Sequence, residues 1–136
     1  MRFDAALVAK FLIFGGIGGG VYVFDASCFW LLIQLTGLPS LARVLSVALA
    51  VTLSWWLNRT YTFRVSGPVN WGEMLKFVLS QLPGACINAF FSLLAFHYLP
   101  LVQGNTWLAA AIGSCAGLVA NFTMAHLFVF NKNRNA

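Results

Sequence analysis

The sequence predicts an all-α integral membrane protein with four transmembrane helices, and two properties of the chain predict this class. Of the 136 residues, 60% are hydrophobic and only 8% are charged, whereas a soluble domain carries about 25% charged residues. So few charges cannot cover the surface for water, and lipid must therefore cover part of it. The length accommodates four spans of about 20 residues with short loops, which leaves no room for a soluble catalytic domain.

Four apolar segments define the expected spans. We expect a single membrane domain over residues 1–136, with spans at approximately residues 11–35, 41–63, 77–99 and 107–130. The first run is too long for the apolar core of a signal peptide, so it is expected to be a retained helix. Residues 69–78 fit either an interfacial helix or a plain loop. The breaks between the spans contain turn-favouring residues, namely Gly37 and Pro39, Gly67 and Pro68, and Pro100 and Gly104.

The distribution of basic residues predicts the orientation of the chain. Lys and Arg accumulate on the cytoplasmic side of membrane proteins. Of the eight Lys and Arg residues, seven lie near the two ends of the chain or the middle loop, and Arg43 lies on the opposite side. The two ends and the middle loop are therefore expected to be cytoplasmic. We interpret the net charge of +5 as topology signals and contacts with lipid rather than as a nucleic-acid surface. These seven are Arg2, Lys10, Arg59, Arg64, Lys76, Lys132 and Arg134.

The two halves of the sequence resemble each other. Residues 54–63 end the second span and residues 121–130 end the fourth, and both stretches place polar, aromatic and cation-capable residues at the same positions. Each half contains two spans, so both halves enter the membrane from the same side. The sequence therefore predicts two parallel two-helix repeats, related by an axis along the membrane normal.

Asp25, the stretch 58–64 and the degenerate repeat at the end of the fourth span resemble the GtrA-like family, and the resemblance covers nearly the whole chain. In the second copy, Ala125 and His126 stand where the family often has Asn-Arg. The resemblance implies the flipping of a polyprenyl-phosphate-linked sugar across the inner (cytoplasmic) membrane for cell-surface polysaccharide modification, commonly beside a membrane glycosyltransferase.

Two other functions stay open. The family is similar to the regulatory subunit of dolichol-phosphate mannose synthase, so the chain could instead anchor or regulate a polyprenyl-phosphate glycosyltransferase. A small four-helix cation or drug exporter is the lesser alternative. In such an exporter Asp25 would bind proton and substrate in turn, but the basic excess argues against a cationic substrate.

Asp25 and Arg43 are the first candidates for substrate binding. An acid at mid-membrane costs ~2.5–3.5 kcal/mol on insertion scales, and such residues usually face a bundle interior or a wet cavity. Asp25 either serves the transport pathway or only pairs with Arg43 and fixes packing. Arg43 can snorkel outward, or it can reach towards Asp25 across an axial gap of roughly 10–15 Å.

The remaining candidates lie in the other spans and at the cytoplasmic face. Arg59, next to Asn58, either binds phosphate through its guanidinium fork or acts as a topology anchor. Asn88 and Asn121 can bond sugar hydroxyls or bridge helices, and bridging is the commoner case. His126 can carry a proton or contact phosphate.

The sequence offers no residues in a pattern typical of catalysis or of metal binding. The sequence contains no carboxylate pair, nucleophile elbow or zinc-ligand spacing, so we expect no enzyme activity, cofactor or metal site. The three cysteines lie in apolar runs and are interpreted as packing residues.

Small-residue pairs such as Gly15/Gly19, Gly16/Gly20 and Gly113/Gly117 predict close helix packing. Four helices form a thin wall around a polar path, so we expect a homo-oligomer or a partner complex.

Overall fold

The computed structural model describes residues 4–103 and 105–131, and within these residues all regular secondary structure is helical. Four helices are long and apolar enough to cross a membrane, as the composition predicts. The chain divides into two compact units, Met1–Val69 and Asn70–Ala136, called here the N-terminal and C-terminal units. The multi-pass membrane character of the chain is therefore confirmed. Arg2, Lys132 and Arg134, which contribute to the predicted orientation, lie outside the described residues.

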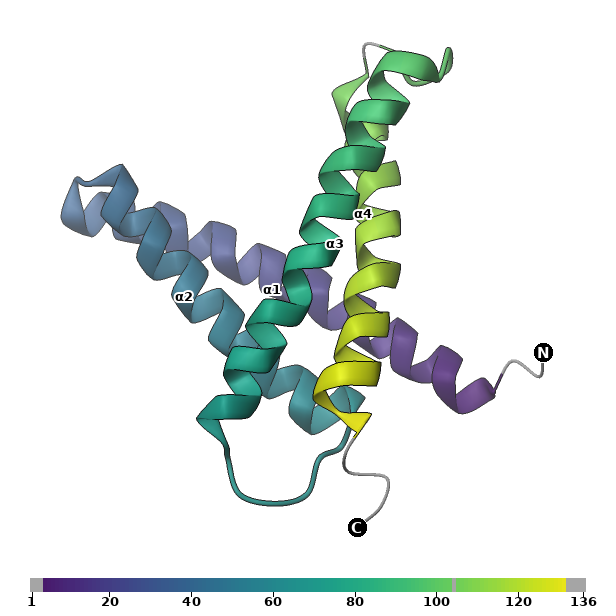
Figure 1. The fold of residues 1–136 in the computed structure, drawn as a ribbon. Helices are drawn as coiled ribbons and strands as arrows, with labels where there is room; N and C mark the ends of the chain where they lie inside the picture. The colour runs from purple at the N-terminus through teal and green to yellow at the C-terminus, as the bar shows by residue number, and fades with distance from the viewer. Residues whose placement is uncertain (1–3, 104, 132–136) are drawn as a thin grey trace. The chain divides into compact units, whose positions relative to one another are not determined.

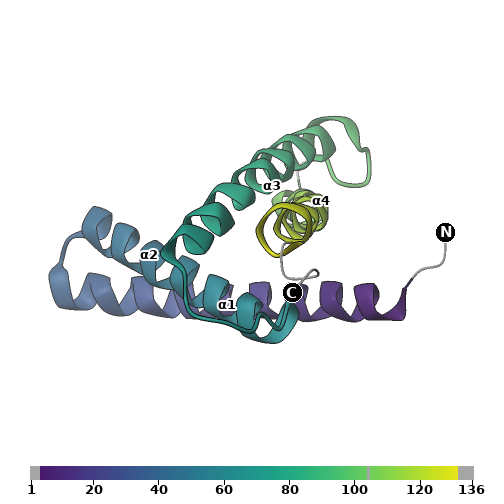
Figure 2. The ribbon, with the colours of Figure 1, turned by 60° about the horizontal axis from the view of Figure 1, so that its bottom comes forward.

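The N-terminal unit is a helical hairpin of α1 (Ala5–Thr36) and α2 (Pro39–Leu57), followed by the short π-helix η1 (Asn58–Thr62). Figure 1 shows α1 and α2 side by side, joined by a tight turn, and Figure 2 shows the same pairing from another side. The turn forms because Gly37 adopts a left-handed φ of 66° and its N–H bonds to the carbonyl of Ile33. Pro39 then starts α2, at the helix position that proline favours.

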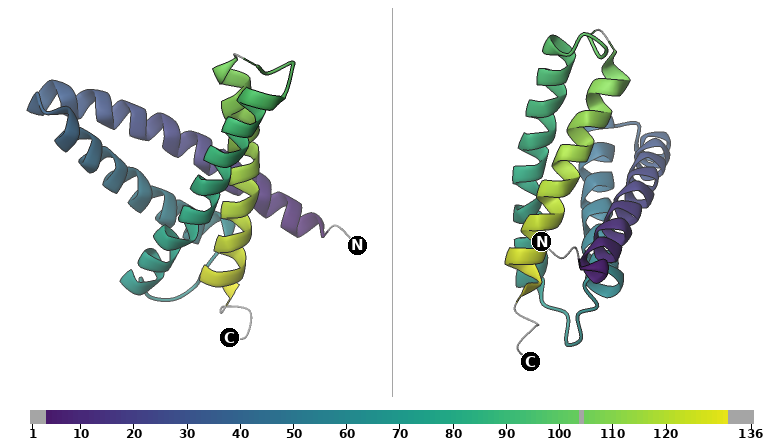
Figure 3. Two further views of the ribbon diagram at one scale, coloured as in Figure 1. Left: turned by 45° about the horizontal axis from the view of Figure 1, so that its top comes forward. Right: turned by 90° about the vertical axis from the view of Figure 1, so that its right-hand side faces the viewer.

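The C-terminal unit has the same sequence of elements, with α3 (Trp71–Tyr98), α4 (Thr106–Met124) and the π-helix η2 (Ala125–Val129). Both views in Figure 3 show α3 and α4 packed along each other. Helix α3 begins at Trp71, and the side chain of Asn70 caps it by accepting from the N–H of Gly72. Of the two interpretations of residues 69–78, helix is therefore the one seen from Trp71 onward.

Glycines let α3 and α4 approach closely. A Cβ on Gly117 would lie 2.8 Å from the backbone oxygen of Gly84 and 2.9 Å from the Cβ of Asn88. A Cβ on Gly113 would overlap Ser92 and the backbone of Asn88. Close packing at the Gly113/Gly117 pair is therefore confirmed, since neither position has room for a side chain.

The glycine-rich face of α1 behaves differently. Among the described residues, nothing lies within 4 Å of a Cβ placed on Gly16, Gly18, Gly19 or Gly20. The prediction of close packing for Gly16/Gly20 is therefore not met within the described part of the chain. The physical reason is that no neighbouring group of the described chain comes within van der Waals contact of these four positions.

Candidate functional site

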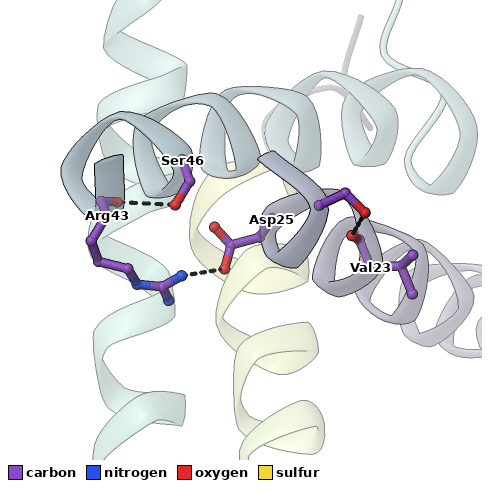
Figure 4. Close-up of polar contacts among 5 residues, drawn as sticks. Val23, Asp25, Arg43 and Ser46 are labelled. Atoms are coloured by element: carbon purple, nitrogen blue, oxygen red, sulfur yellow. Dashed lines mark hydrogen bonds and ion pairs between the residues drawn. The ribbon is translucent and has the colours of Figure 1, made fainter. Parts of the chain in front are cut away.

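The N-terminal unit contains an ion pair between its two helices. The Nη1 atom of Arg43 on α2 donates to the Oδ2 atom of Asp25 on α1 at 2.9 Å, and Figure 4 shows the two side chains reaching towards each other. The Asp25 side chain is 16% exposed, whereas that of Arg43 is 51% exposed. The sequence left this pairing open because of the axial gap between the residues. The long side chain of Arg43 closes that gap.

The surroundings of the pair contact the guanidinium of Arg43 but leave one carboxylate oxygen of Asp25 without a hydrogen bond from the described residues. The guanidinium carbon of Arg43 lies 5.3 Å from the centre of the Phe29 ring, a cation–π distance. The Oδ1 atom of Asp25 is buried and has no hydrogen-bond partner among the described residues. An ionised carboxylate accepts bonds at both oxygens, so Asp25 retains the capacity to accept one more donor.

Asn58 lies at the start of η1 and is almost fully buried, at 1% exposure. Its Nδ2 atom donates to the carbonyl of Ser54 at 2.9 Å, and its Oδ1 atom accepts from the hydroxyl of Thr62 at 2.8 Å. Both halves of the amide are thus occupied by the chain's own groups. The arrangement spans the transition from α-helix to π-helix, where backbone bonding changes from four to five residues.

Arg59 is also buried, at 8% exposure. Its Nη2 atom donates to the carbonyls of Gly67 and Pro68, at 3.1 and 3.0 Å. These contacts connect η1 to the loop that follows it, and in that loop Arg64 has a left-handed φ of 49°. The geometry therefore gives Arg59 a positioning role in the loop, while phosphate binding by Arg59 stays a prediction.

In the C-terminal unit, Asn88 lies in a polar seam between α3 and α4. Its Nδ2 atom donates to the hydroxyl of Ser114 on α4 at 3.5 Å, and its Oδ1 atom accepts from Ser92 at 3.2 Å. This places Asn88 in a helix bridge, the more common of the two roles that the sequence left open.

Asn121 and His126 lie at the other end of the same helix pair. The side chain of Asn121 packs directly over Gly84, where a Cβ would overlap it, and its Oδ1 atom is buried without a partner among the described residues. His126 is in η2 and stacks on Phe122, with ring centroids 5.9 Å apart and an interplanar angle of 4°. Asn121 thus has an acceptor available, as Asp25 does in the N-terminal unit.

The structure brings some predicted residues together and adds others. Asp25 contacts Arg43, and Asn58 and Arg59 share η1. Asn88, Asn121 and His126 belong to the C-terminal unit, with Asn88 on α3, Asn121 on α4 and His126 in η2. The polar partners that sequence reasoning missed follow a simple signal, a Ser or Thr four residues from an Asn, and they are Ser54, Thr62 and Ser92.

The described residues offer little metal or thiol chemistry. Among the described residues no group of three His, Cys, Asp or Glu side chains is placed to hold a metal ion. Cys28, Cys86 and Cys115 are free thiols. In this part of the chain the polar chemistry within the spans therefore comes from the ion pair, the buried amides and the hydroxyls.

Comparison with known proteins identifies one family. The family model described as GtrA/DPMS, transmembrane domain, matches residues 10–130. The match includes both helical hairpins and both π-helices. No curated protein matches the chain.

Proposed function

The chain belongs to the GtrA/DPMS transmembrane domain family, and from this membership we propose that it flips a polyprenyl-phosphate-linked sugar across the inner (cytoplasmic) membrane for cell-surface polysaccharide modification. The polar headgroup passes along the helices while the prenyl tail stays in lipid. The phosphodiester carries one negative charge. Moving it outwards from a negative interior is favoured by ~2.3 kcal/mol per 100 mV if it crosses the full field, so no ion coupling is required.

The observation that carries the proposal is the intramembrane ion pair of Asp25 and Arg43. An acid and a base inside apolar spans are costly and mark substrate pathways. Pairing reduces this cost, yet among the described residues one buried oxygen of Asp25 has no hydrogen-bond partner, and the Arg43 side chain is half-exposed. A substrate with a phosphate and several hydroxyls offers both the acceptor and the donors that such a pair can use.

The topology completes the proposal. Both ends and the middle loop are cytoplasmic, and the two hairpins form parallel repeats. The similar order of elements in the two units supports the repeats, because each second helix ends in a five-residue π-helix at the corresponding stretch of sequence. We further propose that the working form is a homo-oligomer or a complex with a membrane glycosyltransferase, and that the chain itself is not an enzyme.

A second function is supported by the family description, which includes DPMS beside GtrA. In this alternative the chain anchors or regulates a polyprenyl-phosphate glycosyltransferase and moves no substrate. The cation exporter has less support, because the Asp25 carboxylate that would hold the cation is already bonded to Arg43.

Reconstitution separates these functions. Proteoliposomes containing only this chain should accelerate the appearance of a prenyl-phosphate sugar on the opposite leaflet, measured by its accessibility to an impermeant oxidant of sugars. Protein-free vesicles give the background rate. A rate equal to that background would remove autonomous flipping. Co-purification with a glycosyltransferase whose turnover depends on the chain would favour the regulatory alternative.

A further inference from the structure

The two arginines of the second span are held in opposite ways. Arg59 is buried, and its Nη2 atom bonds two backbone carbonyls of the following loop. The Arg43 side chain is 51% exposed, and the one hydrogen bond of its guanidinium to the described residues goes from Nη1 to Asp25. A guanidinium carries five N–H donors in a planar fork. Of the two arginines, Arg43 is therefore the one whose N–H groups are exposed and can donate hydrogen bonds to a ligand.

The ring of Phe29 supports the Arg43 guanidinium. The guanidinium carbon lies 5.3 Å from the ring centre, so the ring stabilises the cation without using its N–H groups. When the guanidinium turns away from Asp25, its planar fork can bind two oxygens of a phosphate, a geometry that arginine matches and lysine does not.

The position of Arg43 along α2 suits a phosphate at the membrane interface. Helix α2 begins at Pro39, so Arg43 lies only about 6 Å from the helix start at ~1.5 Å per residue. Asp25 lies about 16 Å from the end of α1 at the same rise, which is deeper in the hairpin. The Arg43 side chain can thus reach inwards to the carboxylate or snorkel outwards to the headgroup level.

From these contacts we infer that Arg43 binds the phosphate of the lipid-linked sugar at the interface next to the α1–α2 turn, and that Asp25 competes with the phosphate for the same guanidinium. This inference rests on the proposed function and identifies Arg43 as the residue that binds phosphate in that pathway. Arg43 is called here the phosphate station. When phosphate takes Arg43, Asp25 becomes an unpaired carboxylate inside the span, which is costly. The return of Arg43 to Asp25 removes this cost and so promotes release of the phosphate.

A binding measurement tests this exchange without requiring transport. The full chain, in phosphatidylcholine nanodiscs, is titrated with radiolabelled farnesyl phosphate, which has the phosphate and the isoprenoid but no sugar. Arg43→Gln should weaken binding about tenfold or more, because hydrogen bonds to charged groups are worth about 1.5–3 kcal/mol. Asp25→Asn should tighten binding several-fold, because the neutral amide no longer competes with phosphate for the Arg43 guanidinium. Arg64→Gln, with the same change in charge on an exposed loop residue, should leave binding unchanged.

The controls separate the sources of phosphate and guard against misfolding. Unlabelled farnesyl phosphate should displace the label, whereas farnesol, inorganic phosphate and phosphatidylglycerol should not. Equal displacement by phosphatidylglycerol would reduce Arg43 to a general headgroup anchor and overturn the inference. The double variant Asp25→Asn with Arg43→Gln contains no unpaired charge, so weak binding by this variant cannot be assigned to an isolated buried acid.

Two results for the variants would overturn the inference. Unchanged binding in both variants that lack Arg43 would place the phosphate elsewhere, and weaker binding in Asp25→Asn would make the acid a ligand group rather than a competitor. The proposed function fails separately. The predicted binding pattern together with no translocation in proteoliposomes would keep the phosphate station and remove autonomous flipping.

Discussion

The hydroxyl of Thr62 donates to the Oδ1 atom of Asn58 across one turn of η1, at 2.8 Å, with both side chains almost fully buried. The Nδ2 atom of the same amide donates to the carbonyl of Ser54. The pair therefore satisfies buried polar groups at the point where α2 changes into the π-helix.

Thr62→Val should lower the stability of the protein, because it keeps the shape of the side chain and removes the donor to Asn58. Leaving a buried acceptor without its bond costs about 1–3 kcal/mol. The check is the unfolding midpoint in detergent. Thr62→Ser keeps the hydroxyl and should lose much less, so equal losses in the two variants would show that the methyl group matters rather than the bond.

Arg59→Lys should release the loop after η1. Lysine keeps the charge, and therefore the membrane orientation, but it lacks the planar fork through which Arg59 reaches the carbonyls of Gly67 and Pro68. Faster amide hydrogen exchange in residues 64–70 is the expected result, with normal abundance in the membrane. Exchange that is as slow as in the wild type would contradict the positioning role of Arg59.

Gly117→Ala should destabilise the C-terminal hairpin. The new Cβ would lie 2.8 Å from the backbone oxygen of Gly84, and neither helix can give way without losing contacts elsewhere. Overpacking of this kind costs about 1–3 kcal/mol. The matched variant Gly19→Ala adds the same methyl group where nothing lies within 4 Å. Thermal unfolding of the two variants should therefore differ, and a loss of the same size in both would refute the close approach.

The fold was largely predictable from the sequence, because run length and the absence of charge identify a span without any knowledge of packing. The tight turn at Gly37 and Pro39 was also visible, since these residues have few other uses between two apolar runs. Neither π-helix was foreseen. Their sequences, one polar at Asn58 and the other apolar at Ala125, share no pattern that separates a π-turn from an α-turn.

The candidate site was predictable as a set of residues but not as a set of contacts. Asp25 stood out because an acid inside a span is costly. Its bond to Arg43 depends on the conformation of a long side chain, which residue spacing does not determine. The sequence indicates Arg59 as a phosphate ligand or a topology anchor. The loop carbonyls that it contacts depend on the backbone around Gly67, which has a φ of 126°, and the sequence pattern did not indicate that conformation.

The Asp25–Arg43 pair allows the sharpest test of the proposed pathway, because each residue can be neutralised without a large change in shape. Asp25→Asn should reduce translocation in proteoliposomes, since phosphate held by Arg43 is no longer displaced by the acid. If the pair were only structural, Asp25→Asn would instead lower abundance and thermal stability, because Arg43 would lose its counter-charge.

The double variant Asp25→Asn with Arg43→Gln then separates the two roles. Removing both charges should restore any stability that Asp25→Asn loses, because neither residue is left unpaired, and a double-mutant cycle measures this coupling directly. Translocation should not return with the stability, because both the phosphate station and its competitor are absent. Stability and translocation that recover together in this variant would show that the ion pair serves the packing of α1 against α2 and would remove Asp25 and Arg43 from the pathway.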